Sequence, residues 1–339
     1  MKFTRAARVT AVLIVIGLAA LSGAGLALGY WGPIGSIKLA ETPPRAAPSQ
    51  DRRIDGVEIT AYVTGWVRAP ASILIDQNDP RTPDRLSSPQ WVPSLAYAVR
   101  HPRHGVAVLD TGLRAGSCDY GLRPVYWVPC RNEPGQDLVS QLEAGEVDAD
   151  EIAHIVVSHF HGDHISGLSA LLDMTDAPVL TTRASLEAVR SPLRAARGIP
   201  AVMLGSDMQV QLVDELMAPG VGGIVSHDVF GDGSLQLFET PGHADGHLSA
   251  YVRTVDREIL LTFDAAPLQA NFDLEIPSGA VVSRQAALDS LARLKRLERA
   301  LGDPLIIFGH EPGQWRCVDP TARLNRAPPR CAPDATEPI

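Results

Sequence analysis

His159-Phe160-His161-Gly162-Asp163-His164 places three imidazoles and a carboxylate on six consecutive residues, directly after the apolar run Ile155-Val156-Val157. Burying so many polar side chains costs free energy unless a partner binds them. Neutral imidazole and carboxylate groups are good ligands for zinc and similar divalent cations. The stretch therefore predicts a metal site rather than a solvated, histidine-rich turn.

Three later segments share one pattern with this stretch, because in each an apolar run is followed closely by a ligand-type side chain. They are Leu235–Phe238 followed by Thr240-Pro241-Gly242-His243, residues 259–263 followed by Asp264, and residues 305–309 followed by His310. Rigid strands that deliver functional side chains from their ends are a common way for α/β folds to build sites. The sequence therefore predicts seven metal ligands that meet at one edge of a sheet: His159, His161, Asp163, His164, His243, Asp264 and His310.

The order His-x-His-x-Asp-His, Pro-Gly-His, Asp and His resembles the fingerprint of the metallo-β-lactamase superfamily, and within it the branch of N-acyl-homoserine lactonases. The similarity spans roughly residues 55–315 and includes Leu109-Asp110-Thr111-Gly112, residues 229–234 and Phe308-Gly309-His310-Glu311. It implies an α/β fold, a four-layer αββα sandwich. In this chain the sandwich is expected to be preceded by one N-terminal hydrophobic segment. The metallo-hydrolase domain is expected over residues 54–316.

The resemblance also implies how the seven side chains divide between two metal ions. His159, His161 and His243 would hold one ion, Asp163, His164 and His310 the other, and Asp264 would bridge them together with a water or hydroxide. Side chains two apart in an extended segment point to the same side, which suits His159 and His161.

Two divalent ions, expected to be zinc, can lower the pKa of a shared hydroxide towards neutrality and polarise a carbonyl. The resemblance implies that Asp163 is both a ligand and the proton shuttle. The expected reaction is therefore hydrolysis of a small lactone or carboxylic ester by a metal-bridging hydroxide.

One position departs from the lactonases that the chain resembles. Three residues after the bridging aspartate they most often carry a tyrosine whose hydroxyl contacts the substrate carbonyl, whereas this chain has Pro267. Losing such a hydrogen bond costs on the order of 10²-fold in rate if nothing replaces it. The identity of the lactone or ester therefore stays open. A glyoxalase-II-like thioesterase and a metal-binding scaffold without turnover are the alternatives, and a panel of lactones and thioesters would separate them.

Other polar side chains near these motifs are expected to play supporting roles. Asp110 resembles a position that supports the metal loop from behind, because ligating histidines need outer partners that fix their tautomers. His247 is expected beside the site rather than among the ligands, and His154 is expected to be structural. Solvated turns or loops are predicted at His101, His104 and His227-Asp228.

Three basic residues, Lys2, Arg5 and Arg8, precede an uncharged run over residues 9–30. Those 22 residues are enough to cross a bilayer core as a helix, and the basic flank predicts that the N-terminus stays in the cytoplasm. A cleaved signal peptide and an uncleaved transmembrane anchor both fit residues 1–30. Either one predicts an exported domain on the periplasmic or extracellular face, anchored to the inner membrane by residues 9–30 if the segment is retained.

Proline-rich segments flank the expected domain, as a linker over residues 31–53 and a C-terminal tail over residues 317–339. The chain has four cysteines, which tend to oxidise outside the cytoplasm and allow three pairings. We expect pairing between sequence neighbours, Cys118 with Cys130 and Cys317 with Cys331.

The formal net charge of the chain is −9 at pH 7. An acidic protein is a poor candidate for nucleic acid, because that binding depends on phosphate neutralisation by lysine and arginine. The sequence also contains neither a Gly-x-x-x-x-Gly-Lys-Ser/Thr phosphate loop nor a Gly-x-Ser-x-Gly nucleophile elbow. The expected partner is a small-molecule lactone or ester, and the oligomeric state is left open.

Apolar periodicity predicts the elements that carry these motifs. Strands are expected over residues 59–62, 94–99, 106–109, 155–157, 235–238, 248–252, 259–261 and 305–308. Leucines at three- and four-residue steps predict a helix over Ser283–Leu301, with Ser283 as its N-cap and Gly302 as its stop.

Overall fold

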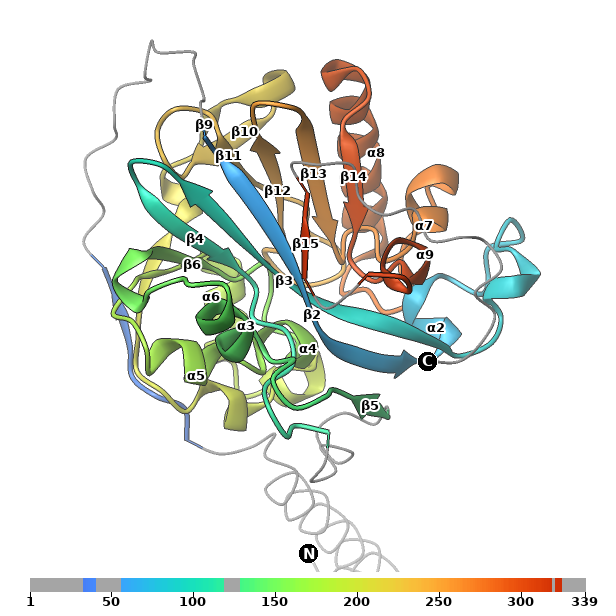
Figure 1. Ribbon diagram of the computed structural model, residues 1–339. Helices are drawn as coiled ribbons and strands as arrows, with labels where there is room; N and C mark the ends of the chain where they lie inside the picture. Colours follow the sequence, from blue (N-terminus) through green and yellow to red (C-terminus); the bar gives the residue numbers. More distant parts are fainter. Residues whose placement is uncertain (1–32, 41–55, 119–128, 319–320, 325–339) are drawn as a thin grey trace, which may run out of the picture.

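The structure is a computed structural model that describes residues 33–40, 56–118, 129–318 and 321–324. Two mixed β-sheets lie face to face, and helices cover the outer face of each sheet (Figure 1). The order of layers is therefore helix, sheet, sheet, helix. This arrangement confirms the four-layer αββα fold.

The first sheet contains nine strands within the described residues, in the order β1-β8-β7-β6-β4-β3-β2-β15, with β5 also paired to β2. Their bounds are β1 Ile37–Leu39, β2 Glu58–Ala69, β3 Gln90–His101, β4 Gly105–Leu109, β5 Cys130–Arg131, β6 Ile152–Val156, β7 Val179–Thr181, β8 Met208–Leu212 and β15 Thr321–Arg323. The β2, β3 and β4 strands pair antiparallel, whereas β4, β6, β7 and β8 pair parallel. The carboxyl-terminal ends of β4, β6 and β7 therefore lie at the same edge of this sheet.

The second sheet has the order β14-β13-β12-β11-β10-β9. Its strands are β9 Ala218–Pro219, β10 Val225–Asp228, β11 Leu235–Glu239, β12 Leu248–Arg253, β13 Glu258–Phe263 and β14 Leu305–Phe308. All neighbours pair antiparallel except β13 and β14, which run parallel. The carboxyl-terminal ends of β13 and β14 therefore lie at the same edge of this sheet.

The helices divide between the two outer faces (Figure 1). Next to the first sheet lie α3 Leu138–Ala144, α4 Gly162–Ile165, α5 Leu168–Leu172 and α6 Arg183–Arg190, and next to the second lie α7 Gln269–Leu274 and α8 Arg284–Leu301. Two single-turn helices, α2 Ala71–Leu74 and α9 Pro312–Trp315, lie beside the ends of β2 and β3. Short 3₁₀ helices span Asp84–Leu86, Ala149–Glu151, Arg194–Arg197, Ala201–Leu204, Val213–Glu215 and Val221–Gly223.

The α8 helix confirms the helix predicted from the leucine spacing. The Ser283 hydroxyl accepts a hydrogen bond from the backbone N–H of Ala286, and Gly302 ends the helix in the left-handed conformation with φ of 80°. Leu291, Leu294 and Leu297 are buried against the second sheet. The leucine stripe is therefore core packing.

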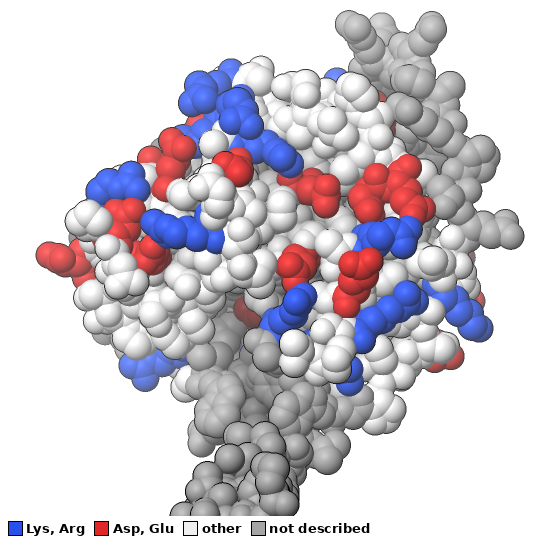
Figure 2. All heavy atoms as spheres, turned by 180° about the vertical axis from the view of Figure 1, so that it is seen from behind, with Lys and Arg blue, Asp and Glu red and all other residues white. Residues whose placement is uncertain are grey.

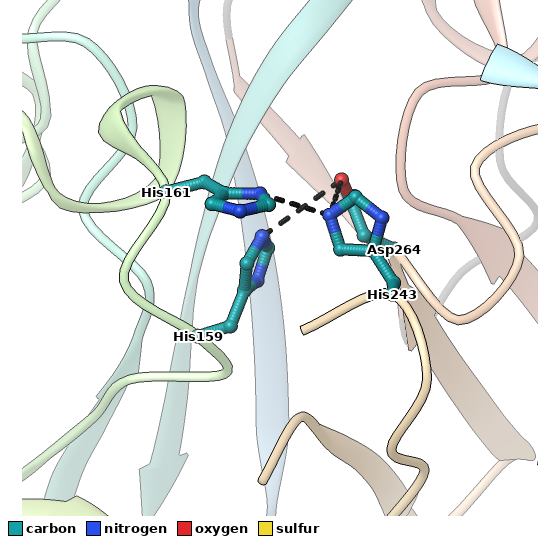
Figure 3. A group of neighbouring side chains, drawn as sticks. All are labelled: His159, His161, His243 and Asp264. Atoms are coloured by element: carbon teal, nitrogen blue, oxygen red, sulfur yellow. Dashed lines mark hydrogen bonds and ion pairs between the residues drawn. The ribbon is translucent and has the colours of Figure 1, made fainter. Parts of the chain in front are cut away.

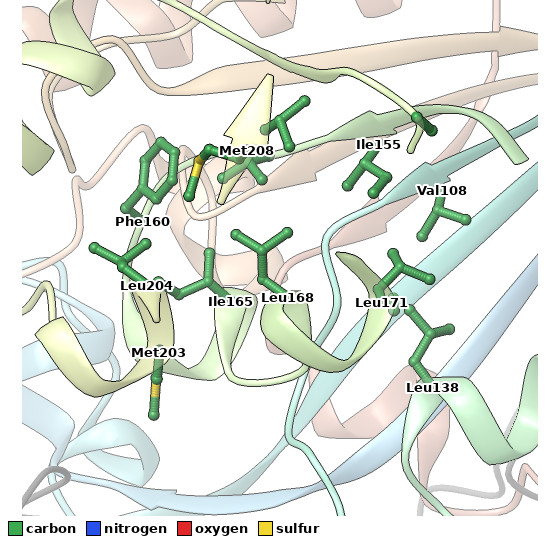
Figure 4. Close-up of a cluster of buried hydrophobic side chains, with 14 of the residues drawn as sticks. Val108, Leu138, Ile155, Phe160, Ile165, Leu168, Leu171, Met203, Leu204 and Met208 are labelled. Atoms are coloured by element: carbon green, nitrogen blue, oxygen red, sulfur yellow. The ribbon is translucent and has the colours of Figure 1, made fainter. Parts of the chain in front are cut away.

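Three apolar clusters fill the spaces between the four layers. Between the sheets, Ile59, Leu95 and Leu109 from the first sheet share a cluster with Leu237, Val252 and Leu261 from the second. Outside the first sheet, Val108 and Ile155 share a cluster with Leu138, Ile165 and Leu168 from the helices (Figure 4). Because residues 106–109 of β4 are buried on both faces, this strand reads in the sequence as a continuous apolar run rather than as an alternating one.

Two short strands lie within segments that the proline content predicts to be linker and tail. Ile37–Leu39 forms β1 and pairs with β8, and Thr321–Arg323 forms β15 and pairs with β2. Leu324, which follows β15, is completely buried. Apolar residues between the prolines are therefore enough to add one strand at each edge of the first sheet, and at these points the linker and tail predictions are wrong.

Within the described residues, no helix is both long and apolar enough to cross a membrane. The hydrophobic run over residues 9–30 lies outside the described residues. On the face opposite to the view in Figure 1, basic side chains are interspersed with acidic ones (Figure 2). That face is therefore of mixed charge.

Candidate metal centre

The loop that follows β6 carries the first four candidate ligands. His161 occupies the N-cap position of α4, so Asp163 and His164 lie on the first turn of that helix while His159 and His161 precede it. The backbone N–H of Leu248, at the start of β12, donates to the carbonyl of Ser158 at 2.9 Å. This contact joins the second sheet to the loop directly before His159.

The other three candidate ligands come from the second sheet. His243 lies in the connection between β11 and β12, Asp264 directly follows β13, and His310 follows β14 after one glycine. Figure 3 shows His159 and His161 approaching from one side and His243 and Asp264 from the other. Ring nitrogens of His159 and His243 face the carboxylate, and a ring nitrogen of His161 faces His243. All seven predicted side chains therefore meet at the edge where the two sheets come together.

The carboxylate of Asp264 lies between two groups of imidazoles. Its Oδ2 atom is 3.2 Å from His243 Nε2 and 3.9 Å from His159 Nε2. Its Oδ1 atom is 3.3 Å from His164 Nε2 and 3.0 Å from His310 Nε2. Each carboxylate oxygen thus faces a different pair of histidines.

The ligand atoms form two compact sets that could each hold a metal ion. One set is His159, His161, His243 and Asp264, and the other is Asp163, His164 and His310, with the ligand atoms of each set within 4.8 Å of one another. His161 Nδ1 is 2.9 Å from His243 Nε2, and His310 Nε2 is 3.5 Å from Asp163 Oδ2. The division agrees with the one that the family resemblance implies.

Several polar atoms of this cluster have no hydrogen-bond partner among the described residues. They are Nε2 of His159, Nε2 of His164, Nδ1 of His243 and Oδ1 of Asp264, all in buried side chains. Leaving a buried polar atom unsatisfied costs about 1–3 kcal/mol. Lone pairs that converge without protons to share are what a divalent cation satisfies, so the residues present fit a pair of such ions.

The outer nitrogens of the histidines are held by other groups. His310 Nδ1 donates to the carbonyl oxygen of Pro93 at 2.8 Å. Because that oxygen can only accept, His310 carries its proton on Nδ1 and presents the Nε2 lone pair to the cluster. His159 Nδ1 is 3.1 Å from the Ser158 hydroxyl, which itself donates to Asp110 Oδ2 at 2.7 Å. The ring orientations are therefore set from outside the cluster.

His247 contacts Asp264 but belongs to neither set of candidate ligands, as expected from the sequence. Its Nε2 atom accepts a hydrogen bond from the backbone N–H of Asp264 at 3.1 Å, and its Nδ1 atom is 2.9 Å from the hydroxyl of Thr240. Burial lowers the pKa of His247 to about 3. The ring is therefore neutral, and each of its two nitrogens has a hydrogen-bond partner.

Burial also lowers the pKa of His159 and of His243 well below the ordinary value. Both rings are neutral at physiological pH, which is the form that binds metals. Burial opposes charge on His164 too, but the nearby carboxylates, Asp264 foremost, outweigh it and raise the pKa of His164. Burial would raise the pKa of Asp264, yet the surrounding imidazoles, His310 first, hold it well below its usual range. Asp264 is therefore ionised, as a bridging ligand must be.

The sequence and fold of known proteins agree with this geometry. The metallo-beta-lactamase superfamily matches residues 89–310, which is more than half of the chain and contains all seven candidate ligands. The chain belongs to the metallo-beta-lactamase superfamily.

Relatives within this superfamily include N-acyl homoserine lactonases. The chain is 30% identical over 175 residues to one from Bacillus thuringiensis, covering 51% of this chain and 62% of that one. It is 28% identical over 236 residues to the lactonase AttM of Rhizobium johnstonii, covering 66% of this chain and 84% of the relative. The alignment thus spans less than two thirds of the length of the Bacillus thuringiensis lactonases.

Solved structures of the superfamily share the fold. An N-acyl homoserine lactone hydrolase with N-hexanoyl-L-homoserine bound at its catalytic metal center has a TM-score of 0.62 at 22% identity, covering 77% of this chain and 96% of that one. AidC, a dizinc quorum-quenching lactonase, has a TM-score of 0.53 at 14% identity, covering 77% of this chain and 89% of AidC. At these identities the likeness establishes the metallo-beta-lactamase fold.

A cavity of about 450 Å³ opens onto the metal centre. His161, Asp163, His243, Asp264 and His310 form part of its wall, and Pro267 lines it as well. Pro267 therefore lies on the side of the cluster that faces the cavity. A larger cavity of about 960 Å³ lies elsewhere on the protein. None of the seven candidate ligands lines it, so it is not part of this centre.

Two sequence predictions outside the cluster need correction. His101 is only 3% exposed and its Nε2 atom lies 2.8 Å from Asp232 Oδ2, so it is not in a solvated turn. Its ring also packs against Phe230 with centroids 5.0 Å apart. His227 and Asp228 end strand β10 rather than lying in a loop. A distant partner for His101, supplied by the β10–β11 connection, is not visible in local sequence.

Other residues of the centre carried little local signal. Ser158 and Thr240 each fix an imidazole through a hydroxyl, and the Pro93 carbonyl fixes a third. Ser158 directly precedes His159, and Thr240 starts the Thr-Pro-Gly-His motif, so adjacency to the ligands was the available clue. The expected Cys118–Cys130 disulfide is confirmed, whereas the second expected pair includes Cys331, which lies outside the described residues.

Proposed function

We propose that this protein is a dinuclear, metal-dependent hydrolase that opens a lactone or a small carboxylic ester. The observation that carries the proposal is the carboxylate of Asp264, each of whose oxygens faces a separate set of histidine nitrogens. The relatives named N-acyl homoserine lactonases support the same class of reaction. Zinc is the expected metal, because imidazole and carboxylate ligands suit it and because AidC is a dizinc lactonase.

In this proposal His159, His161 and His243 would hold one cation, Asp163, His164 and His310 would hold the other, and Asp264 would contribute to both. Two such cations would supply a nucleophile from water at neutral pH and polarise the substrate carbonyl. Hydrolysis adds water across the acyl C–O bond, so the leaving oxygen must receive a proton.

Asp163 is placed to handle that proton. Its side chain is 21% exposed, against 7% for Asp264, and it lines the cavity. The hydroxyl of Ser94 donates to the Asp163 backbone carbonyl at 2.6 Å and holds the residue at the start of α4. A carboxylate fixed in this way, with one side open to the cavity, can pass a proton from the attacking water to the leaving oxygen.

Metal content and turnover test the proposal directly. We expect about two metal ions per purified chain, and we expect Asp264→Ala to lose most of the metal and all hydrolysis. Asp256→Ala, at an exposed turn between β12 and β13, is the matched control and should keep both. Hydrolysis that survives complete chelation would refute the proposal. The substrate panel includes a thioester, because a glyoxalase-II-like enzyme would use the same metal set, and a metal-loaded chain inert on the whole panel would point to a scaffold.

We also propose that the protein acts outside the cytoplasm. The uncharged run over residues 9–30 behind a basic flank and the Cys118–Cys130 disulfide support this location. Cell fractionation, with N-terminal sequencing of the recovered protein, tests it. A mature protein that begins after residue 20 indicates a signal peptide, an intact N-terminus in the membrane fraction indicates an anchor, and recovery of reduced protein from the cytoplasm would refute export.

A further inference from the structure

Outside the candidate ligands, the cavity at the metal centre is lined mainly by aliphatic side chains. Apart from the candidate ligands and Gly162 and Gly198, its described lining consists of Val67, Ala69, Ile73, Leu74, Val92, Pro267, Ala280, Val281, Val282, Ser278 and Arg197. Ile73 is 41% exposed and Val282 is 50% exposed, although both are large and apolar. Exposed apolar side chains gathered at one cavity indicate a surface that an apolar ligand covers.

The aliphatic residues that line the cavity, here called the apolar wall, are held in place by backbone and side-chain hydrogen bonds. The segment after α7 lies against α2, because the Ser278 hydroxyl donates to the carbonyl of Ile73 at 2.6 Å and the Gly279 N–H donates to the same oxygen at 3.2 Å. A Cβ atom on Gly279 would lie 2.0 Å from the carbonyl oxygen of Ser72, so only glycine allows this approach. On its other side, the Val282 N–H donates to the carbonyl of Gly242, next to His243. The wall is thus tied to the metal centre itself.

The two polar side chains of this wall are already engaged. The Ser278 hydroxyl is 3.2 Å from the Ala280 carbonyl in addition to its bond to Ile73. The guanidinium of Arg197 pairs with the Asp245 carboxylate through Nη1, and because its side chain is 40% exposed, solvent can satisfy its other N–H groups. Pro267, which lines the same cavity, has no side-chain donor. An amide that entered this cavity would therefore exchange its hydrogen bonds to water for an aliphatic surface, which costs free energy.

We propose that the cavity selects lactones or esters whose aliphatic chain is attached directly to the ring or acyl carbon, and that it disfavours substrates with an amide at that position. The inference rests on the proposed lactone or ester hydrolysis and specifies its substrate class. Each added methylene should raise kcat/KM by up to about fourfold while the chain still contacts the wall. A buried, unpaired amide should lower kcat/KM on the order of tenfold or more.

The test compares two substrate series on the full, zinc-loaded chain. One series is γ-alkyl lactones of increasing tail length, and the other is N-acyl homoserine lactones matched to them in number of non-hydrogen atoms. We expect the alkyl lactones to show the higher kcat/KM at each size. Equal or faster hydrolysis of the N-acyl homoserine lactones would overturn the inference and leave the proposed hydrolase intact, whereas failure of both series would overturn the proposed opening of lactones as well.

A variant and a binding measurement separate the wall from the chemistry. Val282→Thr keeps the shape of an exposed wall residue but replaces a methyl group with a hydroxyl, so it should reduce the rise in kcat/KM with each added methylene. Val255→Thr is the matched control, because Val255 is 63% exposed in a turn outside the cavity. Calorimetric binding of straight-chain carboxylates should give a heat-capacity change that becomes more negative with each methylene. A heat-capacity change independent of chain length would overturn the inference, as would equal gains per methylene in the Val282→Thr variant and the wild type.

Discussion

His164 Nδ1 donates to Asp110 Oδ2 at 2.8 Å, in a contact from which solvent is almost completely excluded. Asp110 also accepts hydrogen bonds from the backbone N–H and the hydroxyl of Ser158, at 2.8 and 2.7 Å. The carboxylate is therefore fixed on both oxygens, and it keeps the proton of His164 on the nitrogen away from the cluster. Asp110 acts through His164 as a positioning residue, as the resemblance implies.

Replacing Asp110 with asparagine should weaken metal binding at the set that contains His164. The amide nitrogen of asparagine can donate to His164 Nδ1 and move the imidazole proton to Nε2, where it blocks coordination. We expect metal affinity to fall about 10–100-fold, the usual effect of removing such a partner. Competition with a chromogenic chelator measures it. Asp150→Asn, at an exposed site, is the control, and unchanged affinity in Asp110→Asn would contradict the role assigned to Asp110.

Gly242→Ala should destabilise the fold and displace the neighbouring His243. A Cβ atom on Gly242, which has φ of 132°, would lie 2.2 Å from the backbone nitrogen of Ala287 in α8. We expect a loss of about 2–4 kcal/mol in the free energy of unfolding of the metal-free protein, measured by urea denaturation. Gly223→Ala is the matched control, since Gly223 also has positive φ, 75°, but has nothing within 4 Å of the added atom. Its cost should be only about 1 kcal/mol, and equal costs for the two variants would argue against crowding at Gly242.

Stability should fall with acid partly because of His227, which lies outside the metal cluster. Burial, with the nearby His154 ring, lowers the pKa of His227 to about 4, whereas the unfolded chain has an ordinary histidine. Below pH 6.5 the imidazole of His227 binds a proton in the unfolded state but stays neutral in the folded state. The free energy of unfolding that this group contributes above pH 6.5 is therefore lost as the pH falls towards 4. The slope from this group is at most about 1.4 kcal/mol per pH unit. His227→Gln should therefore flatten the pH dependence of urea denaturation at saturating zinc, and parallel curves for the variant and wild type would contradict this assignment.

Removing the Cys118–Cys130 disulfide should lower stability without removing the metal. The bridge closes a loop with a sequence separation of 12 residues. In the chain-entropy account, such a crosslink contributes about 3 kcal/mol by restricting the unfolded chain. The double variant Cys118→Ser with Cys130→Ser should show the lower urea midpoint while zinc content stays the same. A loss of zinc in this variant would instead indicate that the loop supports the metal centre.

The candidate ligands could be predicted from sequence because each follows an apolar run that also sets its place in the sheet. Four of them lie within six residues, and the other three come directly or shortly after β11, β13 and β14. The parallel pairing of β13 with β14 then brings Asp264 and His310 to one edge. The apolar runs therefore predicted both the strands and the sheet edge at which the candidate ligands lie.

What the sequence did not predict depends on contacts between distant segments. His101 is buried because Asp232, from the connection between β10 and β11, reaches it across the two sheets. Likewise, β1 and β15 form because β8 and β2 offer unpaired edges, and a strand of three residues has too short a pattern to stand out between prolines. The Pro93 carbonyl that orients His310 carries no side-chain signal at all.

The cluster draws His159, His161, Asp163 and His164 from one sheet and His243, Asp264 and His310 from the other. A ribosome must therefore synthesise the chain past residue 310 before a complete set of donors exists. Neither half produced as a separate fragment would retain both cations, and a mixture of the two halves would retain them only after the halves had docked. Zinc retention could thus serve as a reporter of the moment at which the two sheets close on each other.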